Sequence, residues 1–196
     1  GGPDSVFLFH ALNSIKEKYN LEIAVIYINH NLRDDVRNDI EFIDNFAKQN
    51  NIQSYIESVD VKSYAKQNKL SIETAARELR YSKISEIKEK YGYTKIATGH
   101  NLDDNVETFI FRLLRGTSMK GLKGIPATRE NIVRPILMLE KSYILEELNQ
   151  NKLEFLIDYT NDENIYSRNI IRNEIFPHFE RINPKFRNKI INIIDE

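Results

Sequence analysis

The first five residues have the composition of a phosphate-binding turn that opens a helix. They are Gly1, Gly2, Pro3, Asp4 and Ser5, and an apolar run at residues 6–9 follows at once and leads into a helical pattern that ends near Asn20. Glycine lets backbone amides approach an anion, and Asp4 or Ser5 can cap a helix whose positive dipole end then faces that anion. The pattern favours a nucleotide site, with a glycine turn and an ordinary helix cap as the alternative.

A cluster of acids opens a second predicted helix, over residues 104–114, which Gly116 closes. Asp104 and Glu107 are three residues apart, so their side chains share one helix face and could hold an ammonium group or a metal ion. The same spacing is that of a capping box, which is purely structural. Asp103 offers another cap, so capping alone does not account for the cluster.

Two pairs of arginines have helical spacing. Arg77 and Arg80 lie one turn apart, and Arg168 and Arg172 have the i, i+4 spacing that brings both guanidinium groups to one side. Either pair suits a phosphate or a carboxylate, and a solvated helix face is the ordinary alternative.

The glycine-containing segment after the acidic helix has a local excess of positive charge. Between residues 112 and 134, Glu130 is the single acid against Arg112, Arg115, Lys120, Lys123, Arg129 and Arg134. The whole chain has a net charge of -1, so a nucleic acid would have to be held by a local patch such as this one. A solvated loop is the alternative.

Strands and helices that alternate must position these groups. The sequence predicts strands at 22–29, 53–59 and 94–98 and helices at 36–50, 72–91 and 104–114. This order predicts an α/β fold, a doubly wound and mostly parallel sheet with helices on both faces. The polar clusters at 1–5, 29–33 and 99–107 would then meet at the carboxyl ends of the strands, where such sheets bind ligands.

Histidines end two of these strands, and the chain ends in a further helical pattern. His30 and His100 would lie beside the nucleotide together with Gly99, and neither histidine has a partner at metal-ligand spacing. Residues 186–194 have a short apolar helical face. We expect a catalytic domain over residues 1–182 and a helical extension or linker over 183–196.

Composition limits the class of protein. A chain of 196 residues with 41% hydrophobic content can bury the core of one ordinary domain. No membrane-length apolar run and no leader pattern are present, so a cytoplasmic location with no membrane partner is expected. The absence of cysteine excludes disulfides, thiolate zinc sites, iron–sulfur clusters and a cysteine nucleophile from these residues.

The motifs together resemble the PP-loop ATP pyrophosphatases, and among them the tRNA(Ile)-lysidine synthetases. Seven segments match in the family's order: residues 1–5, 29–33, 73–81, 98–108, 115–122, 134–135 and 168–172. The family's leading serine and the strand before it have no counterpart here. Because a phosphate loop normally hangs from a buried strand, we expect the natural protein to extend upstream of Gly1 by a turn or helix, a strand and a serine.

The resemblance implies an enzyme that uses ATP, Mg²⁺ and L-lysine to convert the wobble cytidine of tRNA(Ile) with a CAU anticodon into lysidine. It assigns ATP binding to Gly1, Gly2, Pro3, Asp4, Ser5, His30, Gly99 and His100, with Asp4 also holding Mg²⁺. It assigns catalysis to Asp104, Glu107, Arg80 and Arg172. It assigns tRNA binding to Arg115, Lys120, Lys123, Arg129 and Arg168.

Rival functions stay open. PP-loop enzymes that thiolate tRNA bases with cysteine clusters are disfavoured by the lack of cysteine, and the amidating relatives lack the matches at 29–33 and 168–172. A nucleotide-binding module without turnover would need the phosphate loop but not the acids. A homodimer and a further domain after Glu196 are also left open.

Overall fold

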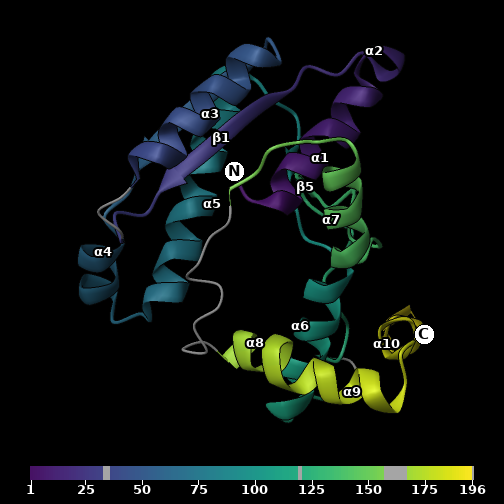
Figure 1. Ribbon diagram of the computed structural model, residues 1–196. Coiled ribbons are helices and arrows are strands. Elements are labelled where there is room, and N and C mark those ends of the chain that lie inside the picture. The colour runs from purple at the N-terminus through teal and green to yellow at the C-terminus, as the bar shows by residue number, and fades with distance from the viewer. Residues whose placement is uncertain (33–35, 119–120, 157–166, 196) are drawn as a thin grey trace. The chain divides into compact units, whose positions relative to one another are not determined.

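The chain forms two compact units, and their boundary crosses the first helix. The computed structural model describes residues 1–32, 36–118, 121–156 and 167–195 (Figure 1). The first unit contains Gly1 and Phe9–Ile96, and the second contains Gly2–Leu8 and Ala97–Glu196. Helix α1 (Pro3–Ser14) contributes to both units, so its first two turns belong with the acidic helix and its remainder with the first sheet.

The first unit is built on two parallel strands. Strand β1 (Ala24–Asn29) pairs with β2 (Gln53–Ser58) over their whole lengths. Helices α3 (Arg37–Gln49) and α5 (Ile72–Tyr91) pack on this pair, and α5 passes behind β1 in Figure 1. The strands predicted at 22–29 and 53–59 and the helices predicted at 36–50 and 72–91 are confirmed, each within about two residues of its predicted bounds.

The ends of α5 illustrate those signals. Its first free amides are capped by Ser71, whose hydroxyl accepts a hydrogen bond from the Thr74 amide. Gly92 ends the helix in the left-handed conformation, with φ of 77°. A residue with a Cβ would be strained there, so the glycine defines the helix end.

Two short helices depart from the predicted pattern. One helix to about residue 20 was expected, but the helix is interrupted at Ile15, and α2 (Lys16–Tyr19) follows α1. Helix α4 (Val61–Asn68) was not predicted at all. Its signal is Asp60, whose carboxylate accepts a hydrogen bond from the Ser63 amide at 3.0 Å. Its buried residues Val61 and Ala65 pack against the small residues of α5.

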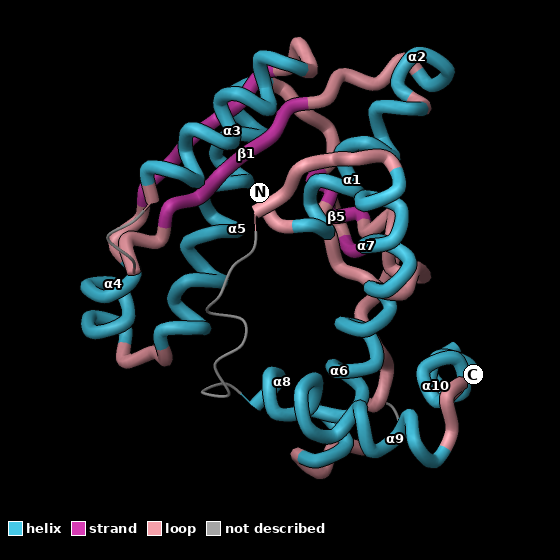
Figure 2. Tube along the Cα trace, viewed as in Figure 1, coloured by secondary structure: helices cyan, strands magenta, loops and turns pink. Residues whose placement is uncertain are grey.

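The second unit has a small sheet and the acidic helix. Strands β3 (Ile96–Ala97), β4 (Thr128–Arg129) and β5 (Ile132–Val133) form a sheet in the order β3-β5-β4, with β4 and β5 antiparallel (Figure 2). β3 is shorter than the predicted strand at 94–98. Helix α6 (Leu102–Leu114) begins two residues before its predicted start, and helix α7 (Lys141–Gln150) was not predicted.

The C-terminal helices share a hydrophobic core with α6. They are α8 (Ser167–Ile170), the π-helical turn η3 (Ile171–Ile175), α9 (Phe176–Ile182) and α10 (Phe186–Asp195). The core contains Leu102, Val106, Phe109, Ile110, Ile171, Phe176, Phe186 and Ile191. The helix predicted at 186–194 is therefore present as α10, and it packs on α6. The domain division at residue 182 stays a prediction. No helix within the described ranges is long and apolar enough to cross a membrane.

This packing makes α10 a structural support of α6. Replacing Phe186, which is buried between α9 and α6, by alanine should lower the free energy of unfolding by about 3–5 kcal/mol, because it removes a ring and leaves a cavity. The matched variant Ile193→Ala, on the same helix at 51% exposure, should change it by less than about 0.5 kcal/mol. Urea unfolding of both variants measures the difference, and equal small effects would contradict a shared core.

Candidate active site

The N-terminus of α6 is capped by Asn101 rather than by the acids that follow it. The side-chain oxygen of Asn101 accepts a hydrogen bond from the Asp104 amide, and the Asp104 carboxylate accepts one from the Asn101 amide, both at 3.0 Å. This reciprocal pair is the capping box of the helix. The alternatives considered from the sequence, a box of Asp104 with Glu107 or a cap by Asp103, are wrong, and Glu107 is left for another role.

Arg172 joins the two acids on the predicted helix face. Its Nε donates to Glu107 Oε1 at 2.6 Å, and its terminal nitrogen donates to Asp104 Oδ1 at 3.2 Å. Glu107 is buried, with 1% of its surface exposed, whereas the Arg172 side chain is 42% exposed. The structure therefore brings together three of the residues named for catalysis, at a place that solvent reaches from the arginine side.

Burial changes the acidity of both carboxyl groups. Burial raises the pKa of Glu107 to about 7, although the charges of Arg172 and, more weakly, Arg168 oppose the rise. Burial also raises the pKa of Asp104, against a hydrogen bond from the Asn101 amide and the charge of Arg172. A carboxyl group with a pKa of about 7 can take up and release a proton at neutral pH, as a general base must.

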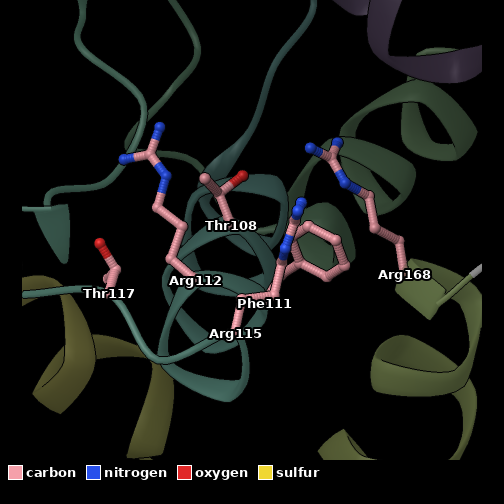
Figure 3. Close-up of a pocket in the computed structure, with 6 residues that line it drawn as sticks. All are labelled: Thr108, Phe111, Arg112, Arg115, Thr117 and Arg168. Atoms are coloured by element: carbon pink, nitrogen blue, oxygen red, sulfur yellow. The ribbon is translucent and has the colours of Figure 1, made fainter. Parts of the chain in front are cut away.

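Arg168 and Arg172 do not act as one pair. Their i, i+4 spacing predicts that both point to one side, but the chain passes through the π-helical turn η3 between them. Arg172 turns to the acids of α6, whereas Arg168 lines a separate pocket beside Phe111 (Figure 3). π-Helical turns are rare and frequently occur at functional sites.

Asp4 is held by two groups and does not cap its helix. Its Oδ2 accepts a hydrogen bond from Lys141 Nζ at 2.6 Å, and its Oδ1 accepts one from Asn101 Nδ2 at 3.0 Å. The Gly2 carbonyl instead accepts from the amides of Ser5 and Val6 at the helix start. Pro3 occupies the first helical position, where a missing N–H costs nothing.

Sequence reasoning missed Lys141 and the partner that holds its backbone. Asp103 accepts a hydrogen bond from the Lys141 amide at 2.8 Å through Oδ2 and one from Arg187 Nε at 2.6 Å through Oδ1. Asp103 thus ties α6 to the starts of α7 and α10. No local spacing signals these contacts, because the partners are far apart in the chain.

Two further predicted site residues adjoin the turn at Asp4. A Cβ on Gly99 would lie 3.1 Å from the Asp4 carbonyl carbon, so a side chain here would push the Asp4 backbone away by a few tenths of an ångström. Next to it, His100 Nδ1 lies 2.9 Å from the Thr98 hydroxyl oxygen. The site around Asp4 therefore draws on residues 2–5, 99–104 and 141, all within the second unit.

The donor set around Asp4 fits a cation that is also held by phosphate. No group of three His, Cys, Asp or Glu side chains in the described parts of the chain is arranged to hold a metal. Mg²⁺ commonly uses only one or two carboxylates and completes its shell with water and substrate phosphates. The Asp4 side chain is 28% exposed and can serve in that way.

His30 and Arg80 form their own contact in the first unit. An Arg80 guanidinium nitrogen lies 3.1 Å from His30 Nε2. Because arginine is always a donor, Nε2 accepts and the proton of the neutral ring resides on Nδ1. Burial and the charge of Arg80 lower the pKa of His30 to about 4, so the ring is neutral at physiological pH. Arg77 packs over the ring of Tyr81.

The basic segment after α6 is less exposed than its composition suggests. Arg134 is buried and donates to the Pro126 carbonyl at 2.7 Å, and Arg112 donates to the carbonyls of Lys123 and Gly124. Lys123 and Arg129 have exposed side chains. Arg33 and Lys120 lie outside the described residues. Two of the arginines in the local excess therefore hold the segment to the fold.

Comparison with known sequences identifies the family of the chain. The sequence matches the PP-loop domain family over residues 1–179. The chain belongs to this family. The α/β fold class and the use of ATP expected from the sequence are therefore those of a PP-loop domain.

Several curated proteins are similar to this chain over almost its whole length. The chain is 40% identical to a tRNA(Ile)-lysidine synthase of Thermosipho africanus and 41% identical to one of Clostridium tetani, in each case over 100% of this chain. It covers 46% and 42% of those proteins, so it spans about half their length or less. One of Petrotoga mobilis is 36% identical over 98% of this chain, which covers 62% of that protein.

A solved structure with the same fold is more distant in sequence. The U34-tRNA thiolase NcsA from Methanococcus maripaludis, with its [4Fe-4S] cluster, aligns with a TM-score of 0.78 and 17% identity. The alignment covers 100% of this chain and 68% of the thiolase. At this identity the likeness supports the fold.

The raised pKa of Glu107 predicts a pH-dependent stability. Since the folded-state pKa, about 7, exceeds the unfolded value near 4.5, the native state keeps the proton longer. The contribution of this group to stability is fully present below pH 4.5 and is lost as the pH rises through about 7. Glu107→Gln should therefore unfold with a flatter pH dependence between pH 5 and 8, measured by urea titration, whereas parallel curves for both proteins would contradict the raised pKa.

Proposed function

We propose that the protein ligates L-lysine to C2 of the wobble cytidine in tRNA(Ile) with a CAU anticodon. The reaction consumes ATP through an adenylated cytidine and yields lysidine, AMP and pyrophosphate. The observation that carries this proposal is the buried Glu107, with a pKa of about 7, paired with Arg172 and Asp104 in the second unit of a PP-loop domain. The names of the similar proteins point to the same reaction.

The chemistry needs a base that accepts a proton from lysine. At neutral pH the ε-amino group of lysine is an ammonium, which is not a nucleophile until a proton leaves. In our proposal Asp104 and Glu107 hold the ammonium, and Glu107 takes its proton before the amine attacks C2 and AMP leaves. Arg172 stabilises the negative charge on the departing phosphate, since its guanidinium is solvent-accessible and adjacent to both acids.

The turn at the start of α1 suits the other half of the reaction. We assign the leaving pyrophosphate to Gly1, Gly2, Pro3 and Ser5, which lie at the positive end of the helix dipole and include the Ser5 hydroxyl as a donor. A Cβ on Gly2 would meet no protein atom within 4 Å, which supports an approach by a ligand. Asp4 would hold Mg²⁺, which neutralises phosphate charge, and Lys141 would neutralise it directly. We also assign His30, Gly99 and His100 to ATP binding, and Arg80 to catalysis.

We assign tRNA contacts to Arg115, Lys120, Lys123, Arg129 and Arg168, by their charge. The described members of this set all lie in the second unit, like the acids of α6. Cytidine in an anticodon loop is unpaired, so phosphates and an exposed base edge are available to such a surface.

Base thiolation is the second candidate, because the structural neighbour is a thiolase with an iron–sulfur cluster. A [4Fe-4S] cluster is held by cysteine thiolates, and these 196 residues contain none. The fold likeness alone, at 17% identity, does not outweigh that difference.

A transfer assay tests the proposed function directly. The protein is incubated with ATP, labelled lysine and tRNA(Ile) carrying a CAU anticodon, and we expect label in the tRNA together with equimolar AMP and pyrophosphate. Parallel reactions with glutamine and with a sulfur donor serve as controls. Entry of sulfur or ammonia into the base would overturn lysidine formation and leave the PP-loop assignment standing.

The acids can be tested by isosteric change. Glu107→Gln and Asp104→Asn should each lower the turnover number by about 10² or more, the scale for a lost general base or electrostatic group. Glu154→Gln, an exposed acid in the same unit, is the matched control and should retain turnover. Normal turnover with a lowered melting temperature would assign both acids to stability alone.

A further inference from the structure

A pocket outside the acid cluster is lined mainly by arginine. Its volume is about 310 Å³, and its lining residues are Thr108, Phe111, Arg112, Arg115, Thr117 and Arg168. Figure 3 shows the three guanidinium groups around the last turns of α6, with Arg168 reaching in from α8. All six residues belong to the second unit.

Among the described residues, no carboxylate forms an ion pair with the charges in this pocket. No carboxylate lines it, and none of the described residues lies within ion-pair distance of Arg115 or Arg168. Arg112 uses one nitrogen to hold the backbone of the following segment and retains other N–H donors. Three cations among six lining residues, with no acid in that lining, make the cavity positive, which favours an anionic ligand.

The absence of an acid also selects among anions. The α-carboxylate of free lysine could pair with an arginine, but its α-ammonium would then lie among three positive charges without a carboxylate. A phosphate group has no such conflict, and arginine binds it through paired hydrogen bonds. The aromatic face of Phe111 is covered by the Arg115 guanidinium, 5.3 Å from the ring centre, so the pocket offers charge rather than base stacking.

The position along α6 separates this pocket from the turn at Asp4. Thr108 and Arg115 follow Asn101, the contact of Asp4, by seven and fourteen residues, or roughly 10 and 21 Å along a helix. The ATP phosphates held at Asp4 would not extend that far. The near end of the pocket nevertheless adjoins Glu107, since Thr108 is the next residue and Arg168 contributes to the pKa of Glu107.

We propose that this pocket binds one phosphodiester of the RNA substrate, the one beside the nucleotide under modification. The inference deepens the proposed function and rests on it. Arg115 and Arg168 hold the phosphate oxygens, and Arg112 supports the pocket from the side of the following segment. Holding the adjacent phosphate fixes the position of the reacting base relative to Glu107, which converts a loosely held loop into an oriented one.

The test uses a short RNA stem-loop with a CAU loop and measures binding over a range of salt concentrations. Arg115→Gln and Arg168→Gln should each weaken binding about tenfold, the scale of a lost charge-assisted hydrogen bond, and lower the slope of log K against log salt by about 0.7. Arg181→Gln, an exposed arginine on α9, is the matched control and should leave the slope unchanged. Arg168→Lys should recover most of the slope, because it restores the charge.

A second arm identifies the phosphate. Stem-loops with an uncharged methylphosphonate on either side of the target cytidine should bind the unaltered protein more weakly at one of the two positions. Arg115→Gln and Arg168→Gln should be insensitive to that same substitution. Insensitivity of the unaltered protein to both, or an unchanged salt slope in both variants, would overturn the proposal.

A third arm separates the pocket from ATP and from the reaction itself. ATP affinity, measured by calorimetry, should be unchanged in Arg115→Gln and Arg168→Gln, and a parallel loss of ATP binding would reassign the pocket to the nucleotide. If the unaltered protein binds the stem-loop through this phosphate but transfers no lysine, the proposed reaction fails and the phosphate site stands.

Discussion

The second unit depends on keeping a carboxyl group inside a helical core. Burying an ionised carboxylate without a partner is costly, and Glu107 is almost completely buried on α6. Arg172 compensates from the solvent side, and it can do so only because η3 and α9 pack on the same helix through Ile171 and Phe176. The apolar core and the charged site are therefore two faces of one helix contact.

A second set of charges extends this arrangement to the other end of the site. Asp103 receives Arg187 from α10 and the Lys141 amide from α7, and Lys141 in turn neutralises Asp4. Around the first turns of α6, four carboxylates meet three cations. Each pair joins segments that are distant in sequence, so these ion pairs add to the apolar core in holding the segments together.

The sequence predicts local elements and residue types better than it predicts partners. Helix α5 has its expected bounds because Ser71 and Gly92 are strong end signals, and each acts on the residues next to it in the chain. Asp104 and Glu107 share a helix face by simple periodicity, as expected. By contrast, the sequence does not show that Asn101 caps α6, because the nearby Asp103 is also a residue type that caps helices.

Long-range contacts account for the remaining differences. Lys141 has no motif around it, and its contact with Asp4 spans most of the chain. The divergence of Arg168 from Arg172 follows from a π-helical turn, which regular i, i+4 spacing cannot anticipate. Arg134 was counted in the positive excess between residues 112 and 134, but its side chain is buried and donates to the Pro126 carbonyl.

Under the proposed function, the metal ion and the substrate ammonium would displace two ion pairs of the site. Lys141 on Asp4 and Arg172 on Glu107 already occupy the positions that a metal ion and a substrate ammonium would take under the proposed function. Binding would then exchange one cation for another at each carboxylate and release Lys141 and Arg172 to nearby phosphate. Such an exchange keeps a cation at each carboxylate throughout, which avoids the cost of leaving a buried acid unpaired at any stage.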